Sequence, residues 1–315
     1  MTSWQQTVLE EFQIRKSKRQ KEAFRAFLCD ELRKRGYEPR IEGGFSKNVV
    51  AGEPETAKLL FTAHYDTCAV LPVPNFITPR NMVWYLLYQL LLVALIFALG
   101  IAAEVGLLLC WDDCPLWAAI GVMYAVILFC GWWILAGPAN RHTVNDNTSG
   151  VLTLLEIAET LPVELRQSVC LVFFDNEELG LLGSGAFAKA HRVAQKEALT
   201  VNFDCVSDGD SLQFFPARAV KGEEETLTAL ERAFSADGGK DVEAVRGFGF
   251  YPSDQAKFRR GVGVCALKKK PLIGYCMDRI HTGRDTVLME ENLHQLAAGA
   301  VRLAEMLQEN NEKLS

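Results

Sequence analysis

The stretch QSVCLVFFDNEE, residues 167–178, passes from two polar residues through six apolar ones to four polar ones. An unbroken apolar run of this length is typical of a strand that is buried on both faces in a parallel sheet. The stretch that follows it, LGLLGSGAFAKAHR, has apolar residues at helical spacing. Together they predict a strand–helix unit whose acidic residues lie at the carboxyl end of the strand.

Strand and helix patterns alternate along most of the chain. The predicted elements are helix within residues 1–36, two strands within 48–67, helix at 152–161, strand within 198–210, helix at 224–236, strands within 258–280 and helix at 292–310. Such alternation predicts a three-layer α/β/α domain with a mixed sheet. A chain of 315 residues is long enough to bury a core of that size.

The composition limits the classes of partner. A net charge of −6 gives no electrostatic case for nucleic-acid binding. Nine cysteines are scattered without CxxC spacing, which favours a reducing compartment. Cys29, Cys170 and Cys205 lie in apolar contexts and are expected in the core. The basic run RKSKRQK, residues 15–21, favours a solvated helix face over a phosphate-binding arm.

Two apolar segments interrupt the α/β pattern. Residues 82–103 have Gln89 as their only strongly polar member, and residues 116–136 have none. Each segment is about 30 Å long as a helix, which matches the hydrocarbon thickness of a bilayer. Tryptophan and tyrosine cluster at the segment ends, as at membrane interfaces. These features predict an inserted hydrophobic helical hairpin at residues 79–137 that divides the α/β domain into residues 1–78 and 138–315.

The flanking charges predict the orientation of this hairpin. The connector at residues 110–115 carries two aspartates and no basic residue, whereas Arg80 and Arg141 flank the outer ends. Basic residues concentrate on the cytoplasmic side of membrane proteins, so the α/β domain is expected on the cytoplasmic side, with residues 82–136 in the membrane. The alternative is a cytoplasmic protein whose hairpin covers the active site or forms a dimer.

Residues that suit metal binding follow the predicted strands and turns. They are His64, Asp66, residues 145–147, residues 175–178, Asp204 and His281. Each has an ordinary explanation by itself, such as a hydrogen-bonded histidine, a helix cap or a solvated helix start. However, ligand sites of open α/β sheets lie at the carboxyl ends of strands, and imidazoles combined with carboxylates suit zinc. Together these residues predict two zinc ions that share a carboxylate.

Five motifs occur in order along the chain: AHYDT, NDNTSGVLTLLEIA, FFDNEELGLLGS, NFDCV and IHTGRDT. The set resembles the signatures of the co-catalytic zinc aminopeptidases of peptidase family twenty-eight. The resemblance spans residues 59–286 once the hairpin is left out, and five ordered motifs make it specific. It departs from the family pattern in one place, because 80 positions (146 − 66) separate Asp66 from Asp146 and the hairpin fills that distance.

The resemblance implies a zinc-exopeptidase fold with two zinc ions per chain. In it His64 is similar to the imidazole ligand of one zinc and His281 to that of the other. Asp146 is similar to the bridging carboxylate. Glu178 and Asp204 are similar to the terminal carboxylate ligands, one for each metal.

The resemblance also implies supporting residues. Glu177 is similar to the general base that receives the proton of the attacking water, and Asp66 to the carboxylate that orients the first imidazole. Asp285 is expected to give similar support. Tyr251 and Asp254 lie in a segment similar to the family's loop near the substrate pocket, where they are expected to bind substrate, with Tyr251 stabilising the oxyanion.

The implied activity is hydrolysis of N-terminal residues from peptides or small amides. Alternatives on the same fold are a single-zinc glutaminyl cyclase, a family-twenty amidase and a carboxypeptidase whose carboxylate clamp is Arg259, Arg260 or residues 268–270. His64 favours the two-zinc peptidase over the cyclase. An alternative of another class is a non-catalytic membrane receptor, which loss of a ligand residue would indicate, and none of the ligand residues is missing.

Overall fold

A computed structural model of the chain describes residues 1–236 and 238–312. Its strands are β1 Arg40–Glu42, β2 Asn48–Ala51, β3 Leu59–His64, β4 Val169–Phe174, β5 Leu199–Phe203, β6 Ser211–Pro216, β7 Asp241–Ala244, β8 Gly261–Lys270 and β9 Gly274–Cys276. In this described part, the nine strands form one mixed sheet in the order β1-β2-β4-β3-β5-β8-β6-β7, and β9 pairs with β8. The strands β4, β3, β5 and β8 run parallel in the middle of the sheet.

The strand β4 is apolar at every position because both of its faces are buried. Its side chains alternate between two buried clusters, Val169, Leu171 and Phe173 in one and Cys170, Val172 and Phe174 in the other. Successive side chains of a strand point to opposite faces, so a strand covered on both sides is apolar at every position. The strand predicted within residues 167–178 is confirmed.

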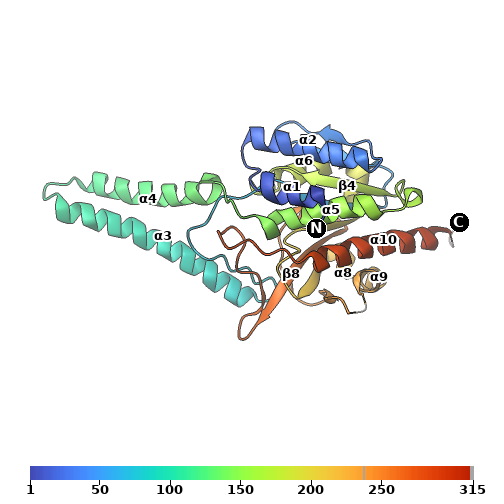
Figure 1. The fold of residues 1–315 in the computed structure, drawn as a ribbon. Coiled ribbons are helices and arrows are strands. Elements are labelled where there is room, and N and C mark those ends of the chain that lie inside the picture. Colours follow the sequence, from blue (N-terminus) through green and yellow to red (C-terminus); the bar gives the residue numbers. More distant parts are fainter. Residues whose placement is uncertain (237, 313–315) are drawn as a thin grey trace.

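Helices cover both faces of the sheet (Figure 1). The helices of the domain are α1 Ser3–Glu11, α2 Lys18–Lys34, α5 Ser149–Thr160, α6 Leu182–Ala190, α7 Arg192–Glu197, α8 Arg218–Lys221, α9 Glu224–Phe234 and α10 Glu290–Glu312, with short turns η1 Val144–Thr148, η2 Val163–Leu165 and η3 Asp254–Lys257. Residues of α2, α5, α9 and α10 pack into the cluster on one face, and residues of α6 and α7 into the cluster on the other. The predicted three-layer α/β/α architecture is confirmed.

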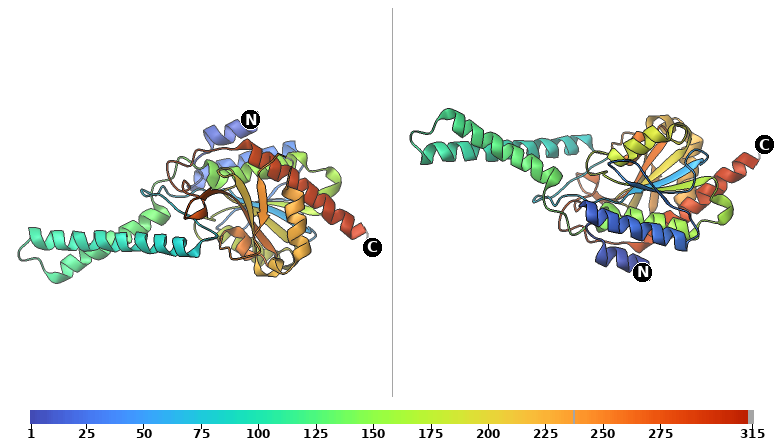
Figure 2. Two further views of the ribbon diagram at one scale, coloured as in Figure 1. Left: turned by 90° about the horizontal axis from the view of Figure 1, so that it is seen from below. Right: turned by 90° about the horizontal axis from the view of Figure 1, so that it is seen from above.

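The predicted hairpin consists of α3 Met82–Cys110 and α4 Leu116–Ala136. The two helices lie side by side and project away from the domain (Figure 2). They approach closely at Gly100, where a Cβ atom would lie 3.2 Å from side-chain atoms of Met123 and Ile127. Both helices are long and apolar enough to cross a membrane, and only 6% of the apolar stretch of each is buried. The first helix continues past its predicted end at residue 103.

The basic run at residues 15–21 does not form one solvated helix face. Arg15 precedes α2 and is fully buried. Its Nε donates to the backbone oxygen of Tyr65 at 2.5 Å, and its Nη1 donates to Oγ1 of Thr148 at 3.1 Å. The helix begins only after Ser17, whose side chain caps it. The prediction of a solvated face is therefore wrong for Arg15, because the cap divides the run.

Candidate metal centre

Three neighbouring strands bring acidic and imidazole residues to one edge of the sheet. The strand β3 ends at His64, β4 is followed by residues 175–178, and β5 is followed by Asp204. Because β4, β3 and β5 are adjacent and parallel, their carboxyl ends meet at the same edge. Open α/β sheets bind their ligands at this edge.

The first group of candidate ligands is His64, Asp146 and Asp204. All three are buried, and one potential ligand atom from each lies within 4.8 Å of the others. Nε2 of His64 lies 3.3 Å from Oδ1 of Asp146 and 3.5 Å from Oδ1 of Asp204. Its other ring nitrogen, Nδ1, is hydrogen-bonded to the backbone oxygen of Asp66 at 3.2 Å, and Oδ1 of the Asp66 carboxylate lies 3.6 Å away. A metal-binding imidazole is typically oriented by an oxygen acceptor of this kind, a backbone carbonyl or a carboxylate.

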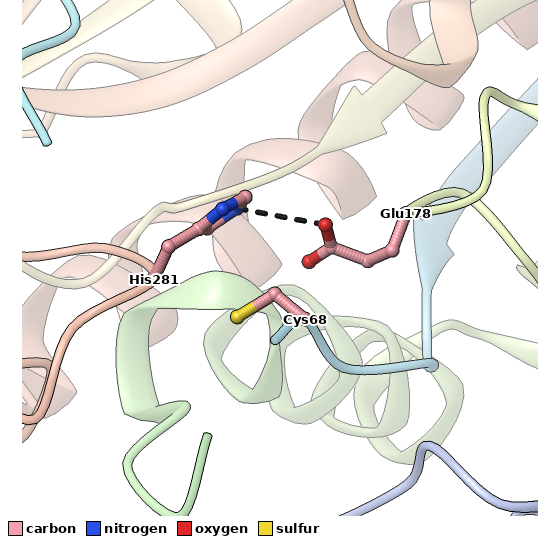
Figure 3. A group of neighbouring side chains, drawn as sticks. All are labelled: Cys68, Glu178 and His281. Carbon is pink, nitrogen blue, oxygen red and sulfur yellow. Dashed lines mark ion pairs between the residues drawn. The ribbon is translucent and has the colours of Figure 1, made fainter. Parts of the chain in front are cut away.

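The second group comprises Cys68, Glu178 and His281 (Figure 3). Nε2 of His281 lies 3.6 Å from Oε2 of Glu178 and 2.9 Å from Oδ2 of Asp146. Oε1 of Glu178 is buried and has no hydrogen-bond partner among the residues that the structure describes. A buried carboxylate oxygen without a partner is costly, and a bound cation would satisfy it.

Asp146 lies between the two groups. Its Oδ1 faces one imidazole and its Oδ2 faces the other, which is the position that a shared ligand of two metals requires. The N–H groups of Asn145 and Asp146 donate to the two carboxylate oxygens of Asp285 at 2.7 and 3.0 Å. Asp285 thus holds the backbone that carries the shared carboxylate.

The Asp66 carboxylate fixes the turn after β4. Its Oδ1 accepts the N–H of Glu177 at 3.0 Å, and its Oδ2 accepts the N–H of Glu178 at 3.2 Å. The residue before these glutamates, Asn176, has a φ of 58°, a left-handed conformation that asparagine tolerates. Asp66 therefore holds both glutamates with its carboxylate and contacts His64 through its backbone oxygen.

Burial and crowding shift the pKa values of the site. Burial raises the pKa of Glu177 well above its ordinary value, and the nearby charge of Glu178 adds to the rise. Burial raises the pKa of Glu178 to about 7. For His281, the lowering of the pKa by burial is outweighed by the Glu178 charge and the Asp146 hydrogen bond, which raise it to about 9. These shifts reflect an excess of negative charge that a divalent cation neutralises.

A cavity of about 170 Å³ opens onto both groups. Its polar wall contains Glu177 and the five candidate ligands, and its apolar wall includes Ile77, Tyr85, Phe250, Tyr251 and Ile280. Tyr85 belongs to the first turn of α3, and its ring packs against that of Phe250 with centroids 6.1 Å apart. The inserted hairpin therefore supplies part of the apolar wall of this cavity.

The two residues expected to bind substrate differ in position. Tyr251 lines the cavity, but its hydroxyl donates to the backbone oxygen of Asp204 at 3.0 Å, so it also fixes a candidate ligand. Asp254 is fully buried in η3. It is absent from the described cavity wall, and its charge raises the pKa of Glu177.

Three residues of the site, Cys68, Tyr85 and Phe250, were not predicted from the sequence. Cys68 lies two positions after Asp66, so its proximity to the first motif was a usable signal. Tyr85 was expected at a membrane interface because it is an aromatic residue at the end of an apolar segment, so its position in the cavity wall was not predicted. Phe250 directly precedes Tyr251 in the loop that was singled out.

The sequence profile of Peptidase family M28 matches residues 129–304, more than half of the chain. The chain belongs to peptidase family M28. Among curated proteins, no sequence matches this M28 chain. Membership implies zinc, and the two groups of histidine and carboxylate side chains fit that metal.

Several solved structures share the fold of this chain. Glutaminyl cyclase of Porphyromonas gingivalis is 19% identical, with a TM-score of 0.63 over 97% of this chain and 96% of that chain. A leucine aminopeptidase precursor of Bacteroides thetaiotaomicron is 14% identical, with a TM-score of 0.58 over 96% and 94%. A Zn-dependent exopeptidase of Parabacteroides distasonis is 16% identical, with a TM-score of 0.55 over 96% of both. At these identities, the likeness shows a shared fold and no particular activity.

Proposed function

We propose that this M28 chain is a two-zinc aminopeptidase. The observation that carries the proposal is the place of Asp146, whose two oxygens lie 3.3 and 2.9 Å from different imidazoles. His64 and Asp204 would complete one metal site, and Glu178 and His281 the other. Zinc bound there would lower the pKa of a water toward neutrality and polarise the scissile carbonyl.

Glu177 is the proposed proton carrier. It lines the cavity, and its backbone is fixed by Asp66 at 3.0 Å. Its pKa is raised by burial, so it holds a proton more readily than an ordinary glutamate. In the proposed reaction, Glu177 accepts the proton of the attacking water and donates it to the leaving amine.

The size of the cavity favours removal of a single N-terminal residue. The buried Asp146 and Asp204 and the half-buried Glu177 and Glu178 line a space of about 170 Å³. A cavity of this size suits one side chain. In the proposed reaction, the free α-amine of the substrate would bind at a carboxylate of this wall, which would restrict attack to the first peptide bond.

The candidate clamps of a carboxypeptidase lie elsewhere. Arg260 pairs with Glu223 at 2.7 Å, and Lys268 pairs with Asp208 at 2.5 Å. Neither cation lines the described cavity. The carboxypeptidase alternative therefore gains no support. The receptor alternative gains none either, because all five candidate ligands line one cavity.

Glutaminyl cyclisation is a second candidate, favoured by the TM-score of 0.63 to the Porphyromonas gingivalis cyclase. It also uses a free N-terminal amine, which here attacks the side-chain amide and releases ammonia. Products distinguish the two reactions, because a peptidase releases an amino acid and a cyclase releases ammonia without cutting the chain.

The test combines metal analysis with a substrate panel. We expect two zinc ions per chain and release of the first residue from free aminoacyl amides and peptides, but none from N-acetylated ones. Chelation should abolish the activity, and added zinc should restore it. Full activity after complete removal of metal would contradict the proposal, and ammonia release from glutaminyl peptides alone would favour the cyclase.

We also propose that the hairpin at residues 79–137 spans a bilayer, with the domain on the cytoplasmic side. Both helices return to the same domain, so an even number of spans keeps the metal centre undivided. The exposed apolar surface of α3 and α4 supports this placement, as do the acidic connector and basic flanks.

A further inference from the structure

A second cavity, of about 740 Å³, lies where the domain meets the end of α4. Its wall contains five cationic side chains, Lys16, Lys18, Lys21, Arg25 and Lys47. The last two residues of α4, Leu135 and Ala136, line the same cavity. Nζ of Lys16 donates to the backbone oxygen of Leu135 at 3.3 Å. Part of the basic run at residues 15–21 thus lies beside the end of a proposed membrane span.

Only two of these cations form ion pairs within the described residues, and both share the single carboxylate of Asp175. Nζ of Lys21 lies 2.7 Å from Oδ1 of Asp175, and Nη1 of Arg25 lies 3.9 Å from its Oδ2. Lys16, Lys18 and Lys47 have no carboxylate within ion-pair distance in the same described part of the chain. The cavity therefore carries three cationic groups that can bind an anion.

With Asp175, three further carboxylates of the wall leave a net charge of +1 (five cations less four carboxylates), but none of the three pairs with Lys16, Lys18 or Lys47 in the described part of the chain. Asp66 accepts two backbone N–H groups in the turn after β4. Glu178 faces His281 in the candidate metal centre. Glu22 is exposed on α2, where water and salt screen it from the interior of the cavity.

Exposed apolar side chains border the basic wall. Phe45, in the loop between β1 and β2, is 80% exposed, and Leu135 at the end of α4 is 62% exposed. Leu179 after β4 is 47% exposed. Large apolar side chains beside lysines and next to a membrane span form an amphipathic surface of the kind that lies at a bilayer interface.

We propose that this cavity binds the headgroup of an anionic phospholipid. The three unpaired lysines complement its phosphate, and Phe45, Leu135 and Leu179 contact the start of its acyl chains. Basic pockets on the cytoplasmic side of membrane helices bind such headgroups. The inference rests on the proposed placement of the hairpin in a bilayer, and the lysines that carry it lie outside the wall of the candidate metal centre, although Glu178 lines both cavities.

The test uses the full chain purified in neutral detergent. The protein is titrated with mixed micelles that contain phosphatidylglycerol or phosphatidylcholine. The midpoint of thermal unfolding is measured, and native mass spectrometry identifies the lipids that stay bound. We expect retention of phosphatidylglycerol that weakens with salt. The triple variant Lys16→Gln, Lys18→Gln, Lys47→Gln should weaken its apparent affinity about tenfold or more. The matched control Lys58→Gln, Lys189→Gln, Lys196→Gln, at exposed lysines outside the cavity, should not.

Further arms separate the proposal from its alternatives. Replacing the same three lysines with arginine should preserve binding, which keeps the test valid if the glutamine variant folds poorly. Equal affinity for both lipids would overturn the proposal. Equal binding of glycerol phosphate, which has no acyl chains, would also overturn it. If the triple glutamine variant raised the KM for acidic peptides only and left lipid binding unchanged, the cavity would instead be assigned to substrate binding. Zinc content and aminoacyl-amide hydrolysis report on the proposed function separately.

Discussion

Glu177 and Glu178 are adjacent in sequence, yet their carboxylates have different surroundings. Glu178 lies 3.6 Å from His281, in the second group of candidate ligands. Glu177 forms no ion pair among the described residues and lines the cavity. Both backbones are held by Asp66. A single turn thus places one glutamate in the candidate metal site and leaves its neighbour available for the proposed proton transfer.

Glu177→Gln should keep the metal and lose the activity. The amide is similar in size but cannot accept the proton of the attacking water, and general-base catalysis contributes about 10² to 10⁴-fold. We expect a fall of that size in kcat, measured with an aminoacyl amide, at unchanged zinc content. The control Glu164→Gln, at an exposed position, should retain activity. Undiminished turnover by Glu177→Gln would contradict the role of this residue.

Asp285→Asn should weaken metal binding without touching a metal. Asp285 accepts the N–H groups of both Asn145 and Asp146, and an asparagine replaces one acceptor with a donor. Loss of such supporting contacts typically costs 10 to 100-fold in metal affinity. Chelator competition measures the change, with Asp278→Asn, a carboxylate paired with Lys270, as the control. Equal zinc affinity in both variants would exclude this supporting role.

At the scale of elements, the first helix of the hairpin has two roles. Most of α3 projects away from the domain (Figure 1), whereas Tyr85 in its first turn lines the cavity of the metal centre. Its ring contacts Phe250, which belongs to the loop that carries Tyr251. The same helix therefore contributes an aromatic side chain to the cavity wall in its first turn and carries exposed apolar side chains along its length.

Tyr85→Ala should change substrate preference. Removing the ring enlarges the cavity and removes packing against the first side chain of a substrate. A hydrophobic contact of this kind contributes about 10 to 200-fold to discrimination. We expect kcat/KM for leucine amide to fall about tenfold and the tryptophan-to-leucine ratio to rise. Tyr124→Ala, on the exposed surface of α4, is the control, and the same selectivity in both variants would contradict this role.

At the scale of the molecule, the hairpin and the domain differ in how much of their apolar surface they bury. The domain buries its apolar residues in three clusters. The hairpin buries only 6% of each apolar stretch, and such surface is costly in water, which supports the proposed membrane placement. The cavity of the candidate metal centre contains Tyr85 of α3, and the lysine-lined cavity contains Leu135 and Ala136 of α4. Both cavities therefore lie where the hairpin joins the domain.

The full chain should remain with membranes after carbonate washing. Leu128→Arg is the sharper test, because a charge near the middle of a span costs about 2.5 to 3.5 kcal/mol on insertion scales. In water the same change at an exposed leucine costs little. We expect Leu128→Arg to reduce carbonate-resistant recovery, while Lys196→Gln leaves it unchanged. Clean recovery of the unaltered chain in the soluble fraction would defeat the membrane placement.

The sequence by itself determined the layers, the edge of the sheet that holds the site, and the apolar hairpin. These features depend on local rules: the period of a strand fixes which residues are buried, and helix length with apolarity fixes what can span a bilayer. The ordered motifs also predicted that His64, Asp146 and His281 belong to one site, and the structure places them within reach of one another.

Only the tertiary structure decided which distant residues meet. It placed Cys68 beside Glu178 and His281, and the Asp285 carboxylate on the backbone of Asp146. It also buried Arg15 while leaving Lys16 and Lys18 on a cavity wall, although all three belong to one basic run. The reason is physical: these contacts join segments far apart in the chain, and no local pattern of charge or hydrophobicity specifies which one folds against which.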